Sequence, residues 1–233
     1  MNKISELTIF FPFWNEGKNI ERVVEKAIPV AEKVADRWEI IMVDDGSSDD
    51  TAQIAKKLEA RNDNLKLISH RPNRGYGAAL REGFDNAKYK YIVFNDGDGQ
   101  FDFSEVTKFL DKIDHADIVI GHRKRRRDNP FRHILMNLLK IWDLILFGFY
   151  YKDIDCGFKL FRKEAIDKIR PLKSEGAMIT TEILAKAKKA HLKIVQVEVN
   201  HYPRIYGDQT GGNLRVILRA VKESLLLWKE LNF

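Results

Sequence analysis

The chain has 233 residues, of which 44% are hydrophobic and 32% charged. This composition is typical of a folded α/β domain and excludes a disordered chain. The excess of Lys and Arg (40) over Asp and Glu (34) gives a net charge of +6. It favours anionic partners: nucleic acid, phosphorylated small molecules or an anionic membrane surface. The single cysteine, Cys156, excludes an internal disulfide, as suits a reducing cytoplasm.

We expect no export signal and no membrane-spanning helix. The apolar residues 7–14 run directly into Asn15 and Glu16 and therefore predict a first β-strand. Residues 134–151 are also apolar, but Lys140 and Asp143 interrupt them. The uninterrupted runs are shorter than the ~20 apolar residues that cross a bilayer.

The first half of the sequence alternates between strand and helix patterns. Strands are predicted at 7–11, 39–43, 65–69, 91–94 and 117–121, and helices at 19–34, about 50–61, 77–87 and 105–113. Apolar strands joined by helices predict an α/β fold with a mostly parallel sheet covered on both faces. Ligands of such sheets bind beyond the carboxyl ends of the strands.

The second half is less regular. Its pattern predicts a strand at 156–161, helices at 163–169 and 181–190, a strand at 193–199 and a terminal helix at about 213–229. No linker or repeat interrupts the sequence, so we predict a single domain over residues 1–233.

An acidic motif follows the predicted strand at 91–94. Asp96 and Asp98 are separated by one glycine, so both carboxylates can reach one divalent cation such as Mg²⁺ or Mn²⁺. A surface turn is the alternative explanation, because Asp and Gly are common in turns.

Three other polar motifs follow strands in the same way. Asp44 and Asp45 offer acceptors to a nucleobase or ribose, although helix capping explains the nearby Ser48 and Asp49. Trp14 and Glu16 offer an aromatic face and an acceptor, although a lone Trp is more often part of the core. In the stretch 73–79, Arg74, Gly75 and small residues open a helix and suit an anionic ligand, or else a tight helix–sheet contact. Four such motifs after successive strands favour one shared site.

These motifs resemble those of the family 2 glycosyltransferases of GT-A fold. Within that family, the chain is most similar to the dolichyl- or polyprenyl-phosphate sugar synthases, such as dolichol-phosphate mannose synthase. The matching residues are Pro12-x-Trp14-Asn15-Glu16, Asp44-Asp45-Gly46-Ser47, Asn73-x-Gly75-x-Gly77-Ala78 and Asp96-x-Asp98-x-Gln100. Later matches are Asp155-Cys156-Gly157-Phe158-Lys159, Glu182 and His201-Tyr202-Pro203-Arg204-x-x-Gly207.

The resemblance implies a role for each matching residue. The nucleoside would be held by Pro12, Trp14, Glu16, Asp44 and Asp45, with Arg74 and Gly75 completing the nucleotide-sugar site. The metal, Mg²⁺ or Mn²⁺, would be held by Asp96, Asp98 and Gln100, and Arg204 would close over the diphosphate. Asp96, Asp98 and Arg204 would thus be the catalytic residues, stabilising the negative charge on the leaving group.

The implied reaction is an inverting transfer of a mannose- or glucose-type sugar from a GDP- or UDP-sugar to a polyprenyl or dolichyl phosphate. Residues 1–121 would bind the nucleotide sugar and residues 122–233 the acceptor. In the second part, the basic run 123–127 and Arg132 suit a phosphate, and residues 130–151 would form an amphipathic interfacial helix. The protein would then be peripheral, on the cytoplasmic face of the membrane. A buried core helix behind a solvated charge run is the alternative.

Three questions stay open at the level of the sequence. Glu182 is a candidate for acceptor or donor positioning, or a helix N-terminal charge favoured by the dipole. The acceptor is alternatively the hydroxyl of a soluble glycan. A nucleic-acid-binding protein is the remote alternative, because the basic charge is local and no groove-reading or base-stacking module accompanies it.

Overall fold

The computed structural model describes residues 3–124, 141–207 and 214–232, the last range with side chains from residue 221 onward. The strands are β1 (Ile4–Phe13), β2 (Ala35–Asp44), β3 (Leu65–Ser69), β4 (Tyr91–Asn95), β5 (Ile118–Arg123), β6 (Phe158–Arg162) and β7 (Ile194–Val199). The helices are α1 (Gly17–Val34), α2 (Thr51–Glu59), α3 (Tyr76–Asn86), α4 (Val106–Ile113), α6 (Lys163–Lys168), α7 (Ile179–Lys189) and α8 (Leu214–Asn232), with a 3₁₀ turn at Phe103–Glu105. A further helical segment covers residues 141–147.

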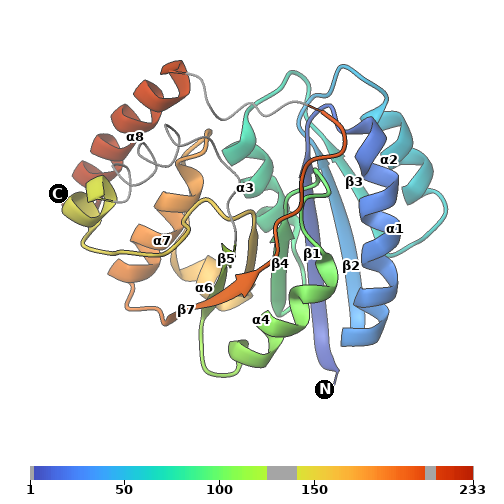
Figure 1. Cartoon of the computed structure of the whole chain (residues 1–233), viewed down its shortest axis with the longest axis horizontal. Helices are drawn as coiled ribbons and strands as arrows, with labels where there is room; N and C mark the ends of the chain where they lie inside the picture. The colour runs from blue at the N-terminus through green and yellow to red at the C-terminus, as the bar shows by residue number, and fades with distance from the viewer. Residues whose placement is uncertain (1–2, 125–140, 208–213, 233) are drawn as a thin grey trace.

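The strands form one seven-stranded sheet in the order β3-β2-β1-β4-β6-β5-β7 (Figure 1). β1 pairs in parallel with β2 and β4, β2 with β3, and β5 with β7. β6 alone runs antiparallel, between β4 and β5. The predicted α/β fold with a mostly parallel sheet is confirmed. The antiparallel direction of β6 is a feature that the sequence pattern did not indicate.

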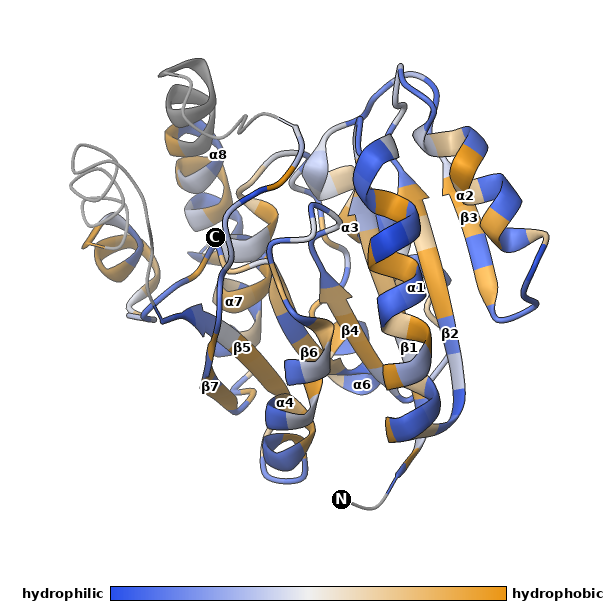
Figure 2. Ribbon diagram, turned by 45° about the vertical axis from the view of Figure 1, so that its right-hand side comes forward, coloured by the Kyte–Doolittle hydropathy of each residue, from blue (hydrophilic) through white to orange (hydrophobic). Residues whose placement is uncertain are grey.

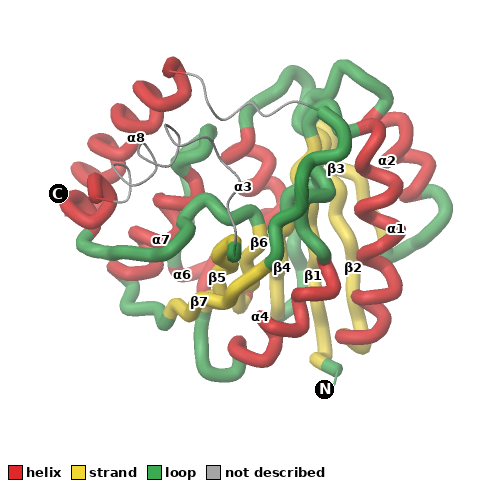
Figure 3. Tube along the Cα trace, in the orientation of Figure 1, coloured by secondary structure: helices red, strands yellow, loops and turns green. Residues whose placement is uncertain are grey.

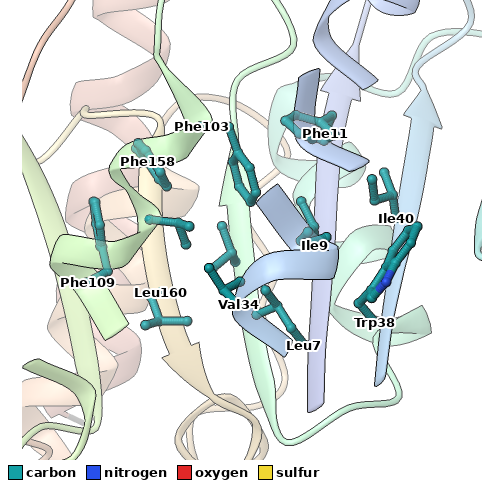
Figure 4. Close-up of a cluster of buried hydrophobic side chains, with 14 of the residues drawn as sticks. Leu7, Ile9, Phe11, Val34, Trp38, Ile40, Phe103, Phe109, Phe158 and Leu160 are labelled. Atoms are coloured by element: carbon teal, nitrogen blue, oxygen red, sulfur yellow. The ribbon is translucent and has the colours of Figure 1, made fainter. Parts of the chain in front are cut away.

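Helices cover both faces of the sheet because alternate strand residues point to opposite sides. Leu7, Ile9 and Phe11 of β1 pack with α1, α2 and α4, whereas Phe10 packs on the other face with α3, α6 and α7. Figure 4 shows the first of these clusters, and Figure 2 shows the apolar strands between more polar helix surfaces. The result is a three-layer α/β/α arrangement.

The parallel strands β1, β2 and β4 all end at the same edge of the sheet, and the loops that follow them gather there (Figure 3). The predicted elements are confirmed with boundary shifts of a few residues. The largest is in β2, which begins at Ala35 because that residue already pairs with Ile4 of β1. This edge therefore collects the four motifs singled out in the sequence.

The helical segment at residues 141–147 lies beside α8, as the indole Nε1 of Trp142 donates to Ser224 Oγ at 2.9 Å. The first part of the predicted interfacial helix, residues 130–140, lies outside the described residues. Among the helices that the structure describes, none combines the length and apolarity needed to cross a membrane.

Candidate active site

A cavity of about 670 Å³ opens at the carboxyl edge of the sheet. Its walls come from the loops after β1, β2, β3 and β4 and from the segment that follows β7. The lining residues are Pro12, Phe13, Trp14, Asn15, Glu16, Asp45, Asn73, Gly75, Tyr76, Ala79, Asp96, Gly97, Asp98, Arg204 and Gly207. Most of the residues predicted for the donor site are thus brought together in one pocket.

The loop after β1 is tied to the loop after β2. Asn15 has a positive φ of 54°, a conformation that Asn tolerates better than most residues. Its backbone N–H donates to Ser47 Oγ at 2.8 Å, and its side-chain oxygen accepts from the Ser48 N–H at 2.8 Å. The turn leaves Trp14 46% exposed at the cavity wall, so the alternative that Trp14 belongs to the core is wrong.

The two acids after β2 have different surroundings. Asp45 lines the cavity, and its carboxylate accepts from the backbone N–H groups of Arg74 (2.9 Å) and Gly75 (2.8 Å) and contacts His70 Nδ1 (2.8 Å). Asp44 is buried, accepts from the Ser47 N–H at 3.1 Å, and is not among the lining residues. Asp45 therefore fixes the turn after β3, while Asp44 fixes its own loop.

The turn after β3 places a tyrosine that the sequence analysis left without a role. Gly75 has a φ of 97°, which L side chains rarely adopt, and the next residue, Tyr76, points its hydroxyl into the acidic motif. The Tyr76 hydroxyl donates to Asp96 Oδ1 at 2.8 Å. In the sequence, the only indication that Tyr76 belongs to the site was its position between Gly75 and Gly77, inside the motif at 73–79.

Asp96 and Asp98 both line the cavity. Burial, and then the charge of Asp98, raise the pKa of Asp96 to about 6. The backbone of the loop before β6 closes this site from behind: the Asp96 N–H donates to Gly157 O at 2.8 Å, and a side chain at Gly157 would overlap the Asp96 carboxylate. The absence of a side chain at Gly157 thus leaves room for the Asp96 carboxylate in its present position.

Arg204 links the acidic motif to the loop after β1. Its Nη2 lies 3.1 Å from Asp98 Oδ2 and 3.0 Å from Glu16 Oε1. Glu16 is nearly buried, and this burial raises its pKa despite the opposing contacts with Asn19 and Arg204. A guanidinium between two carboxylates at a cavity wall can exchange one of them for a ligand phosphate.

Two predicted residues lie outside the lining. The side-chain amide of Gln100 donates to Tyr202 O at 3.0 Å, and the Tyr202 N–H donates to Gln100 O at 2.8 Å. These bonds hold the segment that carries Arg204. Arg74 is more than half exposed, and its side chain points toward Glu82 (3.9 Å). Only its backbone contributes to the site, through Asp45.

The predicted acceptor residues are not part of this cavity either. Arg123 is nearly buried in a two-point ion pair with Asp153, through Nε (2.6 Å) and Nη2 (2.8 Å). Glu182 is buried beneath residues 173 and 174, whose N–H groups it accepts. Arg132 lies outside the described residues.

The cavity suits a divalent cation. The carboxylates of Asp96 and Asp98 line the cavity and are of the type that hard cations prefer, and a neighbouring cation would reverse the rise in the pKa of Asp96. Across the described residues, no group of three or more His, Cys, Asp and Glu side chains is arranged around a metal position.

Residues 8–170 match the family model described as "Glycosyl transferase family 2". The chain belongs to this family. It is 31% identical to a dolichyl-phosphate beta-glucosyltransferase of Saccharomyces cerevisiae, over 93% of this chain and 71% of that protein. It is 26% identical to an undecaprenyl-phosphate 4-deoxy-4-formamido-L-arabinose transferase of Salmonella choleraesuis, over 92% of this chain and 65% of that protein.

Solved structures show the same fold. The glucosyl-3-phosphoglycerate synthase of Mycobacterium tuberculosis, crystallised with Mn²⁺, UDP-glucose and phosphoglyceric acid, superimposes with a TM-score of 0.70 at 17% identity. The match covers 97% of this chain and 79% of that one. The GT-A fold expected from the sequence is confirmed, and the chain is a family 2 glycosyltransferase.

Proposed function

We propose that this glycosyltransferase moves a hexose from a UDP- or GDP-sugar to a polyprenyl phosphate, with inversion at the anomeric carbon and with Mg²⁺ or Mn²⁺. The observation that carries the proposal is the cavity in which Asp96, Asp98 and Arg204 converge. Relatives named for dolichyl and undecaprenyl phosphate acceptors support the acceptor class, and a neighbour crystallised with Mn²⁺ and UDP-glucose supports the metal and the donor class.

The donor would lie across the cavity. Trp14 and Asp45 in the cavity wall would offer a stacking face and an acceptor for the nucleoside, and the diphosphate would lie among Asp96, Asp98 and Arg204. A divalent cation held by Asp96 and Asp98 would supply Lewis-acid stabilisation of the leaving diphosphate. Arg204 would exchange its contacts with Glu16 and Asp98 for the diphosphate oxygens.

The transfer is a single displacement. A phosphate oxygen of the acceptor forms a bond to the anomeric carbon while the bond to the donor diphosphate breaks, and the nucleoside diphosphate leaves with the electron pair. A phosphate monoester has a second pKa of about 6 and is largely in its doubly ionised form at neutral pH. The acceptor therefore needs positioning and charge shielding, but no protein base.

Arg123 and Arg132 are the proposed partners of the acceptor phosphate. Asp153 occupies Nε and Nη2 of Arg123, so a phosphate would approach the edge formed by Nη1 and Nη2. The pair with Asp153 fixes the orientation of the guanidinium in advance, which lowers the entropy lost on binding.

The apolar acceptor chain would be reached at a membrane surface, on its cytoplasmic face. The helical segment 141–147 exposes Ile141, Leu144 and Ile145, with Ile145 70% exposed. Exposed apolar side chains on an amphipathic helix are typical of interfacial elements. The predicted interfacial helix is thus supported over its described part.

The test is a donor screen with labelled UDP-glucose and GDP-mannose, a polyprenyl phosphate and Mn²⁺. We expect label from one donor to move into the organic phase as a sugar phospholipid, and EDTA to prevent this. The transfer of label to an added soluble glycan, with none in the organic phase, would establish the hydroxyl acceptor instead. Retention on DNA without nucleotide binding would favour the nucleic-acid alternative.

A further inference from the structure

Glu182 is a buried carboxylate in the first turn of α7, with only 1% of its surface exposed. It accepts from the backbone N–H groups of Lys173 (2.9 Å) and Ser174 (2.7 Å) and from Lys186 Nζ (2.6 Å). Burial by itself would raise the pKa of Glu182, but these hydrogen bonds, led by that of Lys186, outweigh burial and lower it. An ionised carboxylate with both oxygens occupied is poorly suited to act as a base.

The backbone that Glu182 holds lies directly against the start of α3. The Gly77 N–H donates to Glu175 O at 2.7 Å. A Cβ at Gly75 would lie 2.6 Å from the same carbonyl oxygen, and one at Gly77 would overlap the backbone of residues 174–176. Both glycines are therefore needed for this contact.

The opposite side of the same turn is held by the donor site. Asp45 accepts from the Gly75 N–H at 2.8 Å, and the Tyr76 hydroxyl donates to Asp96 at 2.8 Å. The turn 75–77 is thus fixed between Asp45 and the loop that Glu182 anchors. Any shift of residues 173–175 would move Tyr76 and, through it, the carboxylate of Asp96.

We infer that Glu182 is a positioning residue for the donor pocket, which acts through the backbone of residues 173–175 on Tyr76 and Asp96. This inference rests on the proposed use of the cavity for a nucleoside diphosphate and a divalent cation. It assigns Glu182 to the donor side of the reaction. The other possibility is that Glu182 is a base that deprotonates an acceptor hydroxyl. A base would need a carboxylate oxygen that faces the cavity, and Glu182 is not among the residues that line the cavity.

A double-mutant cycle on binding tests the inference. Affinities for UDP and GDP in the presence of Mn²⁺ are measured by calorimetry for the wild type, Glu182→Gln, Tyr76→Phe and the double variant. Gln keeps the size of the side chain but places an amide N–H₂ group against N–H donors. We expect Glu182→Gln to weaken nucleotide binding about 10-fold, with little further loss when Tyr76→Phe is already present.

The matched control is Glu164→Gln, which changes an exposed acid in the first turn of α6 and should leave binding unchanged. Unaltered nucleotide affinity in Glu182→Gln together with a loss of turnover would overturn the inference and identify a base. Independent, additive effects of the two substitutions would also overturn it. Glu182→Asp, which keeps the charge, serves if the Gln variant does not fold, and is expected to weaken binding in the same direction.

Hydrogen exchange separates this inference from the proposed function. In Glu182→Gln, the amide of Gly77 should lose protection, because its acceptor, Glu175 O, belongs to the released loop. Unchanged protection there would overturn the positioning role, whatever the ligand. Failure of the wild type to bind either nucleotide would instead count against the proposed function, and the exchange result would still decide how Glu182 acts on the turn.

Discussion

Carboxylates serve two distinct purposes at the carboxyl edge of this sheet. Asp96 and Asp98 face the cavity and carry negative charge toward a ligand. Asp45, which also lines the cavity, and the buried Glu182 accept backbone N–H groups of other loops. Each hydrogen bond to an ionised acceptor is worth about 1.5–3 kcal/mol, so these acids determine the shape of the pocket as much as its charge.

The substitution Asp98→Asn tests the first purpose. We expect kcat/KM to fall about 10³-fold, or ~4 kcal/mol, because the amide is a weaker metal ligand and no longer pairs with Arg204. The melting temperature should change by no more than about 3 °C, since Asp98 is partly exposed and the ion pair is worth about 1 kcal/mol at most.

The readouts for Asp98→Asn are initial rates and Mn²⁺ affinity, compared with those of Asp111→Asn on the exposed side of α4. The control should resemble the wild type in both. A variant of Asp98 that retains full activity would remove this carboxylate from the reaction.

The helical segment 141–147 has a buried side and an exposed side. Trp142 donates to Ser224 of α8, and Phe147 stacks on Phe149 with ring centroids 5.9 Å apart. Ile141, Leu144 and Ile145 are exposed. One side of the segment therefore packs on the protein, as the buried-helix alternative expects, and the other side is exposed, as the proposed interfacial helix requires.

Replacement of Leu144 and Ile145 by Ser should reduce binding to anionic vesicles at least ~10-fold, because each apolar side chain contributes about 1.5–3 kcal/mol on burial. Stability should change little, since both side chains are already exposed. Co-sedimentation with vesicles at low and high salt provides the measurement.

The control is Trp142→Ser, which breaks the contact with Ser224 and should lower the unfolding free energy by about 2 kcal/mol. Vesicle binding that survives the change at Leu144 and Ile145 would show that this face is not the one that meets lipid.

Asp143 lies on the buried side of the segment, and burial, followed by the charge of Asp155, raises its pKa to about 7. The carboxyl group of Asp143 thus holds its proton more tightly in the folded state than in the unfolded state. The free energy of unfolding therefore decreases as the pH rises from about 4 to about 7. The upper limit of this change is about 4 kcal/mol.

The variant Asp143→Asn should lack this loss, so its unfolding free energy relative to the wild type should increase from pH 4 to pH 8. Denaturant titrations across this range would measure the difference. A difference that stays constant with pH would show that Asp143 has an ordinary pKa.

At the scale of the whole molecule, the antiparallel strand β6 connects the cavity at the carboxyl edge of the sheet to the second half of the chain. Its register places Phe158 opposite Asn95, at the end of β4. The preceding Gly157 is thereby brought against Asp96. The segment after β7 then returns to the same edge and delivers Arg204. Both halves of the chain contribute to one site.

Ligands that bind at this shared site should stabilise the folded protein against unfolding. Nucleoside diphosphate and Mn²⁺ together, at about 100 times the dissociation constant, should add ~2.7 kcal/mol of stability, or about 5–10 °C in melting temperature for a domain of this size. Mn²⁺ alone should do less, because in the proposed site Asp96 and Asp98 would supply only part of its coordination.

Thermal scans with each ligand alone and with both test this expectation, with Asp98→Asn as the control that should lose the combined effect. If Mn²⁺ raises the melting temperature by the same amount with and without the nucleoside diphosphate, the metal binds independently of the diphosphate.

The sequence by itself determined the alternating α/β order and the positions of the motifs at strand ends. Parallel strands all end at one edge of a sheet, so polar residues after apolar strands are predicted to meet there. The positions of Asp96, Asp98, Glu16 and Arg204 in one cavity agree with that expectation. Local pattern was sufficient here because each motif directly follows the element that places it, or closely resembles a family motif.

Only the tertiary structure decided which of the polar residues face the cavity. Asp45 accepts from residues 29 and 30 positions later in the chain, and Gly157 meets Asp96 because β6 inserts antiparallel between β4 and β5. A carboxylate buried under a loop and one that faces a ligand look alike in sequence. They differ in which N–H groups reach their oxygens, and that depends on the packing of segments far apart in the chain.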